Sequence, residues 1–298
     1  MAKSIKGFTL IEVALFVALT GLLFMGIIIG TGNSIASQRF FDSTQNFAEF
    51  LRSIYSQVSN PESAGNGRSD YVIYGKMISF GQNIDLDYET IPDDEQKIFV
   101  YDVIGKADVE GSGSAVEMMS KVGASVVVSG SADPDDRCIT PVCPAGIAES
   151  YEPRWSASIE ATTKNTVNNR KNLFTGTILV VRHPRSGVIN TVFSPVVINV
   201  NELISTANLT NAAANINRAT NSLMTVLNYS TSSDASLRAK AFVSKEVNFC
   251  VNPEGVNNFG KIRREVRLVA NARNASGVEI IDLDDNNLRD DGVINKCS

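Results

Sequence analysis

The sequence predicts an α+β protein in which one long N-terminal helix precedes an antiparallel β-sheet domain. Three observations lead to this prediction: an uncharged apolar run from Val13 to Gly30, an amphipathic continuation to Ser59, and short apolar or alternating runs beyond Pro61. The 298 residues, 43% of them hydrophobic, are enough to bury a core. The formal net charge of −5 argues against a general nucleic-acid binder, because such proteins carry strongly basic surfaces.

The apolar run is long enough to cross a membrane once. From Phe8 to Gly32 it would form a helix of about 37 Å, against a hydrocarbon core of about 30 Å. Lys3 and Lys6 precede it without an acidic residue between them, which predicts a short cytoplasmic N-terminus and an exported chain after about Thr31. A secretory signal peptide has a shorter apolar core and a small-residue cleavage site, so that alternative fits less well.

The same helix is expected to continue into an amphipathic outer half. Asn60 and Pro61 should end it, because the residue before a proline disfavours the α region and proline has no N–H. The predicted helix has an apolar part, residues 8–32, in lipid or against other helices, and an amphipathic part, residues 33–60, packed on the soluble domain. The apolar residues expected on one face of the amphipathic part are Phe47, Phe50, Leu51, Ile54 and Val58.

Glu12 is an acidic residue at the start of this apolar segment. An ionised side chain costs roughly 2.5–3.5 kcal/mol at the centre of a bilayer, less near its edges, and usually has a partner. No Lys or Arg lies between Lys6 and Arg39. Cleavage between Gly7 and Phe8 would create an α-amino group that is largely protonated at neutral pH. That amine, on a neighbouring subunit, is a candidate partner for the Glu12 carboxylate.

Residues 6–12, KGFTLIE, together with the apolar run resemble the class III signal of type IV pilins and type II secretion pseudopilins. The resemblance covers residues 6 to about 30, and an ordinary membrane anchor is the alternative. It implies a leader of residues 1–7, cleavage after Gly7 by a membrane-embedded prepilin peptidase that also N-methylates Phe8, and assembly into a filament core on an inner-membrane platform. It also implies that Glu12 neutralises the Phe8 amine of an adjacent pilin or pseudopilin.

The membrane helix departs from the family at one point. Many members have a proline partway along it, whereas this chain has none before Pro61 and instead has glycines. Glycine costs roughly 1 kcal/mol relative to alanine in a helix interior, so these positions are candidates for bending or local melting. Close packing of helices in lipid explains them equally well. The glycines are Gly21, Gly26, Gly30 and Gly32.

Residues 61–298 are predicted to form the exported β-rich globular domain. Strand-like runs lie at 71–80, 97–104, 124–130, 177–193, 242–251 and 261–283, and residues 184–187 and 274–277 supply turns. Residues 201–240 read as a helical or loop insertion, with Leu203, Ile216, Leu223 and Leu227 roughly in helical phase. This order of elements is similar to that of H-type minor pseudopilins and FimT-like minor pilins, which implies a pilin-like fold.

The four cysteines all lie on the side expected to be exported, where disulfides are permitted. Of the three possible pairings, Cys138 with Cys143 and Cys250 with Cys297 is favoured. The second pair would form a C-terminal disulfide loop like that of the pilins that the sequence resembles. A zinc site is the rival, but the chain has no paired C-x₂-C knuckles and a single histidine.

The sequence contains no recognisable motif for catalysis or cofactor binding, and no enzymatic activity is predicted. No G-x-S-x-G, Walker A or complete G-x-G-x-x-G motif occurs, and His183 lies in a strand before a turn. The acidic run that includes Asp282, Asp284 and Asp285 offers oxygen ligands that suit calcium, but it fails the EF-hand pattern. A solvated acidic loop is the simpler interpretation.

Two functional hypotheses follow. The first is a structural role as a minor pilin or pseudopilin of a type IV pilus or type II secretion-like filament. The second is a filament-tip binding subunit, an adhesin or DNA-uptake receptor. A basic cluster on an otherwise acidic domain bears on the second and could contact phosphates; charges on the exposed side of a strand are the alternative. The cluster comprises Lys261, Arg263, Arg264, Arg267 and Arg273.

Overall fold

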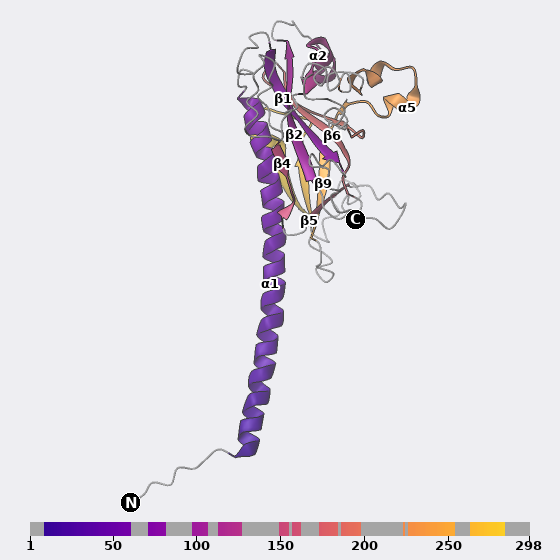
Figure 1. Ribbon diagram of the computed structural model, residues 1–298. Helices are drawn as coiled ribbons and strands as arrows, with labels where there is room; N and C mark the ends of the chain where they lie inside the picture. Colours follow the sequence, from indigo (N-terminus) through magenta and orange to yellow (C-terminus); the bar gives the residue numbers. More distant parts are fainter. Residues whose placement is uncertain are drawn as a thin grey trace, which may run out of the picture. The chain divides into compact units, whose positions relative to one another are not determined.

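The computed structural model describes residues 9–60, 71–81, 97–106, 113–126, 149–154, 157–161, 173–183, 186–197, 223, 226–253 and 263–283. These residues form one long helix, two antiparallel sheets and a few short helices (Figure 1). The α+β class predicted from the sequence is therefore confirmed. The chain divides into two compact units, residues 1–42 and residues 43–298, and the long helix α1 passes from the first into the second.

Helix α1 spans Leu10–Ser59 without interruption, which confirms the predicted single helix. It begins two residues later than expected, because Thr9 caps it. Its end agrees with the stop predicted at Asn60, whose N–H donates to the carbonyl of Ser56 at 3.3 Å. The last turn of α1 contains no basic residue of its own, but Arg182 donates from Nη1 to the carbonyl of Ser59 at 2.7 Å. A distant arginine thus satisfies one of the carbonyls left open at the helix C-terminus.

The larger sheet has eight strands in the order β11-β7-β6-β1-β2-β3, with β4 paired to β2 and β8 paired to β7. Its central pairs β1–β2, β1–β6 and β6–β7 are antiparallel. The strands are β1 (Tyr71–Gly81), β2 (Lys97–Lys106), β3 (Ser125–Val126), β4 (Glu149–Tyr151), β6 (Gly176–Arg182), β7 (Ile189–Ser194), β8 (Val243–Ser244) and β11 (Asn271–Ala272).

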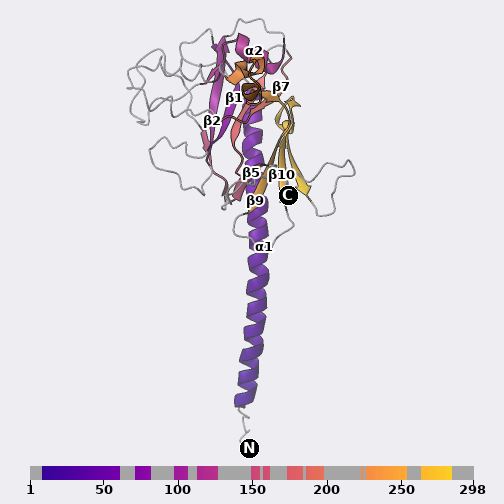
Figure 2. The ribbon, with the colours of Figure 1, turned by 90° about the vertical axis from the view of Figure 1, so that its right-hand side faces the viewer.

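The smaller sheet has four antiparallel strands in the order β12-β10-β9-β5. They are β5 (Ala157–Ala161), β9 (Val247–Pro253), β10 (Arg263–Leu268) and β12 (Val278–Leu283). Figure 2 shows β9, β10 and β12 in orange and yellow. The short helices are α2 (Ala115–Lys121), η2 (Asn228–Thr231), α5 (Ala235–Arg238) and η3 (Ala275–Gly277).

The hairpin predicted around residues 177–193 is confirmed as β6 and β7. Arg182 pairs with Ile189 at its closed end, and the N–H of His183 donates to the carbonyl of Val188 at 2.8 Å. Gly187 has a φ of +67°, a left-handed conformation that favours glycine in this turn. All six residues from Gly176 to Val181 are buried, because both faces of β6 are covered.

From residue 43 onward, the amphipathic part of α1 packs on the β domain as predicted. Phe47, Leu51, Ile54 and Val58 are buried, and Phe50 is partly buried while its ring stacks on Tyr151 with centroids 4.3 Å apart. Each large apolar side chain that is fully buried contributes about 1.5–3 kcal/mol. The ring of Phe47 also meets that of Phe249 on β9 edge to face. Additional aromatic contacts continue this cluster through Phe80, Phe174 and Phe193.

Two turns after Phe47, Tyr55 joins α1 to β7 of the larger sheet and to the turn η3. Its hydroxyl bonds to the hydroxyl of Thr191 on β7, which itself donates to the carbonyl of Val269 at 2.9 Å. Thr191 therefore accepts from Tyr55. The ring of Tyr55 lies over Gly277, where an added Cβ would come within 2.8 Å of Cε1. This glycine lets the end of β11 and the start of β12 approach the helix closely.

A second core lies on the other face of the larger sheet. It includes Met118 and Met119 of α2, and α2 begins at a capping box between Ser114 and Glu117. Leu223 and Leu227 are helical and fully buried in this core, which agrees with the helical phase expected within residues 201–240. Leu203 and Ile216, the other two apolar positions of that phase, lie outside the described residues.

Candidate functional site

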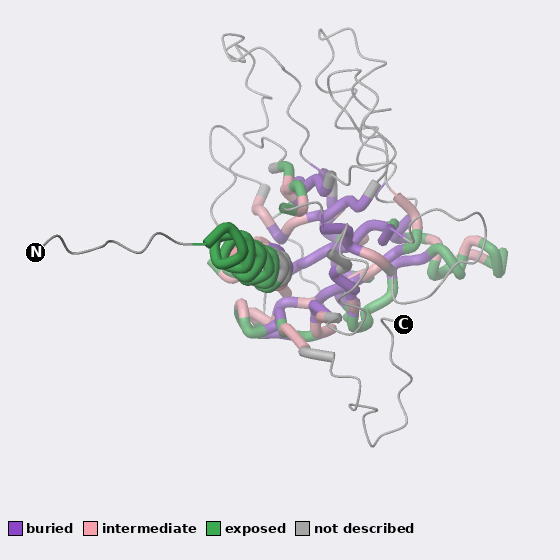
Figure 3. The backbone as a smooth tube through the Cα atoms, turned by 90° about the horizontal axis from the view of Figure 1, so that it is seen from below, coloured by how far each residue is buried: buried purple, intermediate pink, exposed green. Residues whose placement is uncertain are grey.

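The apolar part of α1 exposes large hydrophobic side chains that the subunit itself does not cover. Within the described residues, one helix, α1, is long and apolar enough to cross a membrane: its part Leu10–Ile28 has a mean hydropathy of 2.4, and none of that part is buried. Its large apolar side chains are exposed by 51% to 87% (green in Figure 3). Apolar surfaces of this extent mark sites that contact lipid or other proteins.

The start of this segment is a capping box that the sequence interpretation missed. The N–H and Oγ1 of Thr9 both donate to Oε2 of Glu12, at 2.9 and 3.0 Å, and the N–H of Glu12 donates back to Oγ1 of Thr9 at 3.3 Å. The spacing Thr-x-x-Glu ahead of an apolar run is the signal that predicts it. The helix N-terminus also favours the negative charge of Glu12. Glu12 thus has a local role in starting α1, whatever it contacts elsewhere.

The polar side chains farther along this segment are satisfied within the helix. Thr20 donates from its hydroxyl to the carbonyl of Phe16 at 2.8 Å, and Thr31 donates to the carbonyl of Ile27 at 2.9 Å. Such bonds to the preceding turn let a threonine lie in an apolar environment without an unpaired donor. The hydroxyl groups of Thr20 and Thr31 therefore do not oppose insertion into lipid.

The glycines of the apolar segment have no packing role within the subunit itself. A Cβ added at Gly21, Gly26 or Gly30 would meet no atom within 4 Å. The helix also continues through all of them. Their two sequence-based explanations, bending and close packing against other helices, both stay predictions. Gly7 and Phe8, the residues of the predicted cleavage site, lie outside the described part of the chain.

Cys250, on β9, is disulfide-bonded and mostly buried. The other three cysteines, Cys138, Cys143 and Cys297, one of which is its partner, lie outside the described residues. The pairing with Cys297 therefore stays a prediction. In the register of the smaller sheet, Cys250 lies between Glu160 and Glu265.

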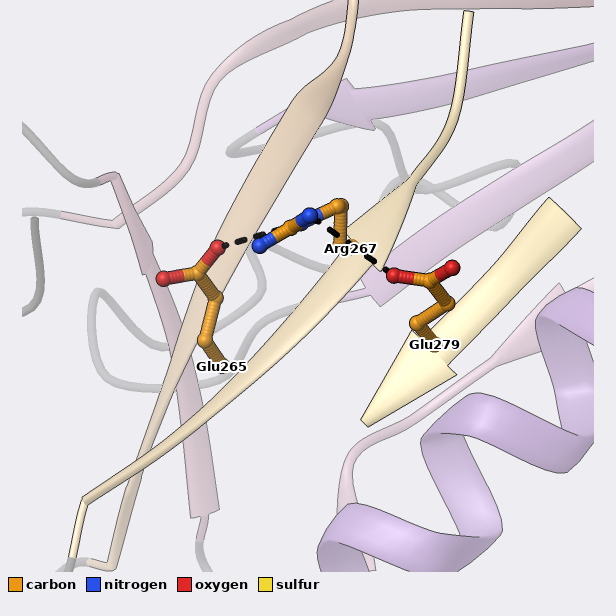
Figure 4. A network of polar contacts seen from close by, with 3 residues as sticks. All are labelled: Glu265, Arg267 and Glu279. Carbon is orange, nitrogen blue, oxygen red and sulfur yellow. Dashed lines mark ion pairs between the residues drawn. The ribbon is translucent and has the colours of Figure 1, made fainter. Parts of the chain in front are cut away.

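Arg267, a member of the predicted basic cluster, lies between two carboxylates (Figure 4). Its Nε is 3.8 Å from Oε1 of Glu265 and its Nη1 is 3.7 Å from Oε2 of Glu279, and its side chain is 14% exposed. Glu265 is itself 5% exposed, so the alternative of charges on an exposed strand face is wrong at this position. Glu265 and Arg267 are two residues apart on β10, so their side chains lie on the same face of the strand, and that face is largely covered.

The other members of the basic cluster are less fully described. Arg264 is half-buried on β10 and has an interaction partner. Arg263 belongs to β10 by its backbone, and Lys261 lies outside the described residues. Arg273 is exposed, whereas Arg264 and Arg267 are partly buried, so the described members form no continuous exposed row of cations that would follow a phosphate backbone. A DNA contact at this cluster stays a prediction. The two carboxylates beside Arg267 argue against it.

The remaining candidate residues give no sign of a metal or catalytic centre in the described ranges. Asp282 lies on β12, whereas Asp284 and Asp285 fall outside those ranges. Among the residues described, no group of three or more His, Cys, Asp and Glu side chains is arranged to hold a metal ion. His183 accepts from the N–H of Ser186 through Nδ1 at 3.3 Å, which stabilises the turn between β6 and β7.

No family model, curated protein or solved structure matches the chain. The α+β class and the exposed apolar helix are consequently established by the chain's own geometry. The pilin-like fold and the filament role rest on the residues around the predicted cleavage site.

Proposed function

We propose that the protein is a minor pilin or pseudopilin, a structural subunit of a type IV pilus or a type II secretion-like filament. In this proposal it is inserted in the membrane as a precursor, cleaved after Gly7 and assembled through α1. The observation that carries the proposal is the exposed apolar stretch Leu10–Ile28, which overlaps the end of the KGFTLIE motif and begins at the capping box of Thr9 and Glu12. One end of α1 is covered by its own domain and the other is not.

An exposed apolar helix of this length is stable only where something covers it. Lipid covers it in the precursor, whose predicted N-terminus stays in the cytoplasm while the β domain is exported. In the filament, the helices of other subunits replace the lipid. The disulfide at Cys250 supports export, because such bonds form and persist outside the reducing cytoplasm.

In the proposed assembly, the carboxylate of Glu12 caps its own helix and also pairs with the amine of an adjacent subunit. Within the described residues, the hydrogen bonds to its carboxylate fall on Oε2, where the cap of α1 uses them. Oε1 is then the oxygen proposed to receive the Phe8 amine of an adjacent subunit. A buried carboxylate without a cation is costly in lipid, so pairing with that amine favours the assembled state.

The partners that follow from this proposal are other pilins or pseudopilins, the prepilin peptidase and N-methyltransferase, the inner-membrane assembly platform, and lipid. The alternative, a filament-tip adhesin or DNA-uptake receptor, gains no support from the described surface, because Arg267 is already flanked by carboxylates. We therefore place the structural role first.

The experiment compares two substitutions at Glu12 in the cell that makes the filament. Glu12→Val removes the charge and half of the capping box, whereas Glu12→Gln removes the charge and keeps a residue that caps well at this position. Both variants should be cleaved and inserted in the membrane. Both should be lost from the sheared filament fraction, measured by immunoblotting against the wild-type chain.

The glutamine variant separates the two roles of Glu12. If only the valine variant is lost, the helix cap matters and the counter-ion does not. If both variants join filaments as well as the wild type, the proposed assembly through Glu12 is wrong.

A further inference from the structure

We draw no further inference here: the strongest candidate, the Thr9 and Glu12 capping box at the N-terminus of α1, belongs to the assembly site already proposed, and no second observation among the described residues points to a ligand there.

Discussion

Two buried tyrosines form a matched pair for testing what polar groups contribute to this core. Tyr55 donates to Thr191, whereas the hydroxyl of Tyr101 is buried without a hydrogen-bond partner among the described residues. Losing the first bond leaves Thr191 with one partner fewer, so Tyr55→Phe should lower the free energy of unfolding by about 1–2 kcal/mol. Tyr101→Phe should leave it unchanged or raise it by about 1 kcal/mol, because no bond is lost.

Chemical denaturation of the two variants in the same detergent measures this difference. Each substitution removes a single oxygen from a tyrosine that is no more than 1% exposed, so each variant is the control for the other. Equal losses of stability would contradict the assigned hydrogen bonding.

The same residue, Tyr55, makes stability depend on alkaline pH. Burial raises its pKa to about 12, and the bond with Thr191 offsets only part of that effect. In the unfolded chain a tyrosine ionises near pH 10. Between about pH 10 and 12 the unfolded chain releases this proton while the folded protein retains it, so stability that is complete below pH 10 is lost as the pH rises.

The loss attributable to Tyr55 approaches about 2.7 kcal/mol near pH 12, from 1.36 kcal/mol per unit of pKa. Burial also raises the pKa of Tyr101 and Tyr151, which adds to the effect in the wild type. Unfolding free energies at pH 9 and about pH 11.5 should therefore differ less in Tyr55→Phe than in the wild type. An equal pH dependence in both proteins would argue against the burial of this phenol.

At the scale of single elements, β1 depends on one glycine. The register of β1 against β2 shifts between Ile73 and Gly75, and Gly75 faces β6 so closely that an added Cβ would lie 2.1 Å from the carbonyl oxygen of Val180. That atom is backbone and belongs to a fully buried strand. Gly75→Ala should therefore cost about 3 kcal/mol, the upper end of ordinary overpacking.

Gly26→Ala provides the comparison, because a Cβ there meets no atom within 4 Å. It should leave unfolding of the β domain unchanged, since alanine only favours a helix that already exists. Thermal unfolding followed by near-ultraviolet circular dichroism reports on both variants. A Gly75→Ala protein as stable as the wild type would contradict the close pairing of β1 and β6.

Local sequence signals predicted some of these elements well. Asn60 and Pro61 marked the end of α1, and the alternation around residues 177–193 predicted the hairpin of β6 and β7, because both signals act within a few residues. The predicted helix start was two residues early, since the Thr9 cap was not recognised. That cap could have been read from the Thr-x-x-Glu spacing.

These local signals do not predict which distant strands pair with one another. Within the strand-like run at 261–283, β10 and β12 pair in the smaller sheet, whereas β11 between them pairs with β7 of the larger sheet. Likewise the run at 242–251 separates into β8 on β7 and β9 on β10. The sheet that each strand joins depends on contacts between segments far apart in the chain, and the spacing of residues along the sequence does not specify those contacts.

At the scale of the whole molecule, the two compact units differ in what covers their apolar surfaces. The unit of residues 43–298 buries its own core between α1, the sheets and the short helices, whereas the apolar residues Leu10–Ile28 of the other unit stay exposed. A chain with that division needs a second apolar environment. In the proposed function, lipid covers this segment in the membrane precursor and the helices of other subunits cover it in the filament. Cleavage after Gly7 is the step that separates these two states.

The most direct test of that account is the mass of the N-terminal peptide of the protein purified from its native membranes. We expect a chain that begins at N-methylated Phe8 and lacks residues 1–7. Gly7→Leu should prevent cleavage, because a side chain there crowds the scissile backbone, and should leave the full-length precursor in the membrane. A native protein that retains Met1 or Ala2 would contradict the pilin interpretation and leave an ordinary membrane anchor.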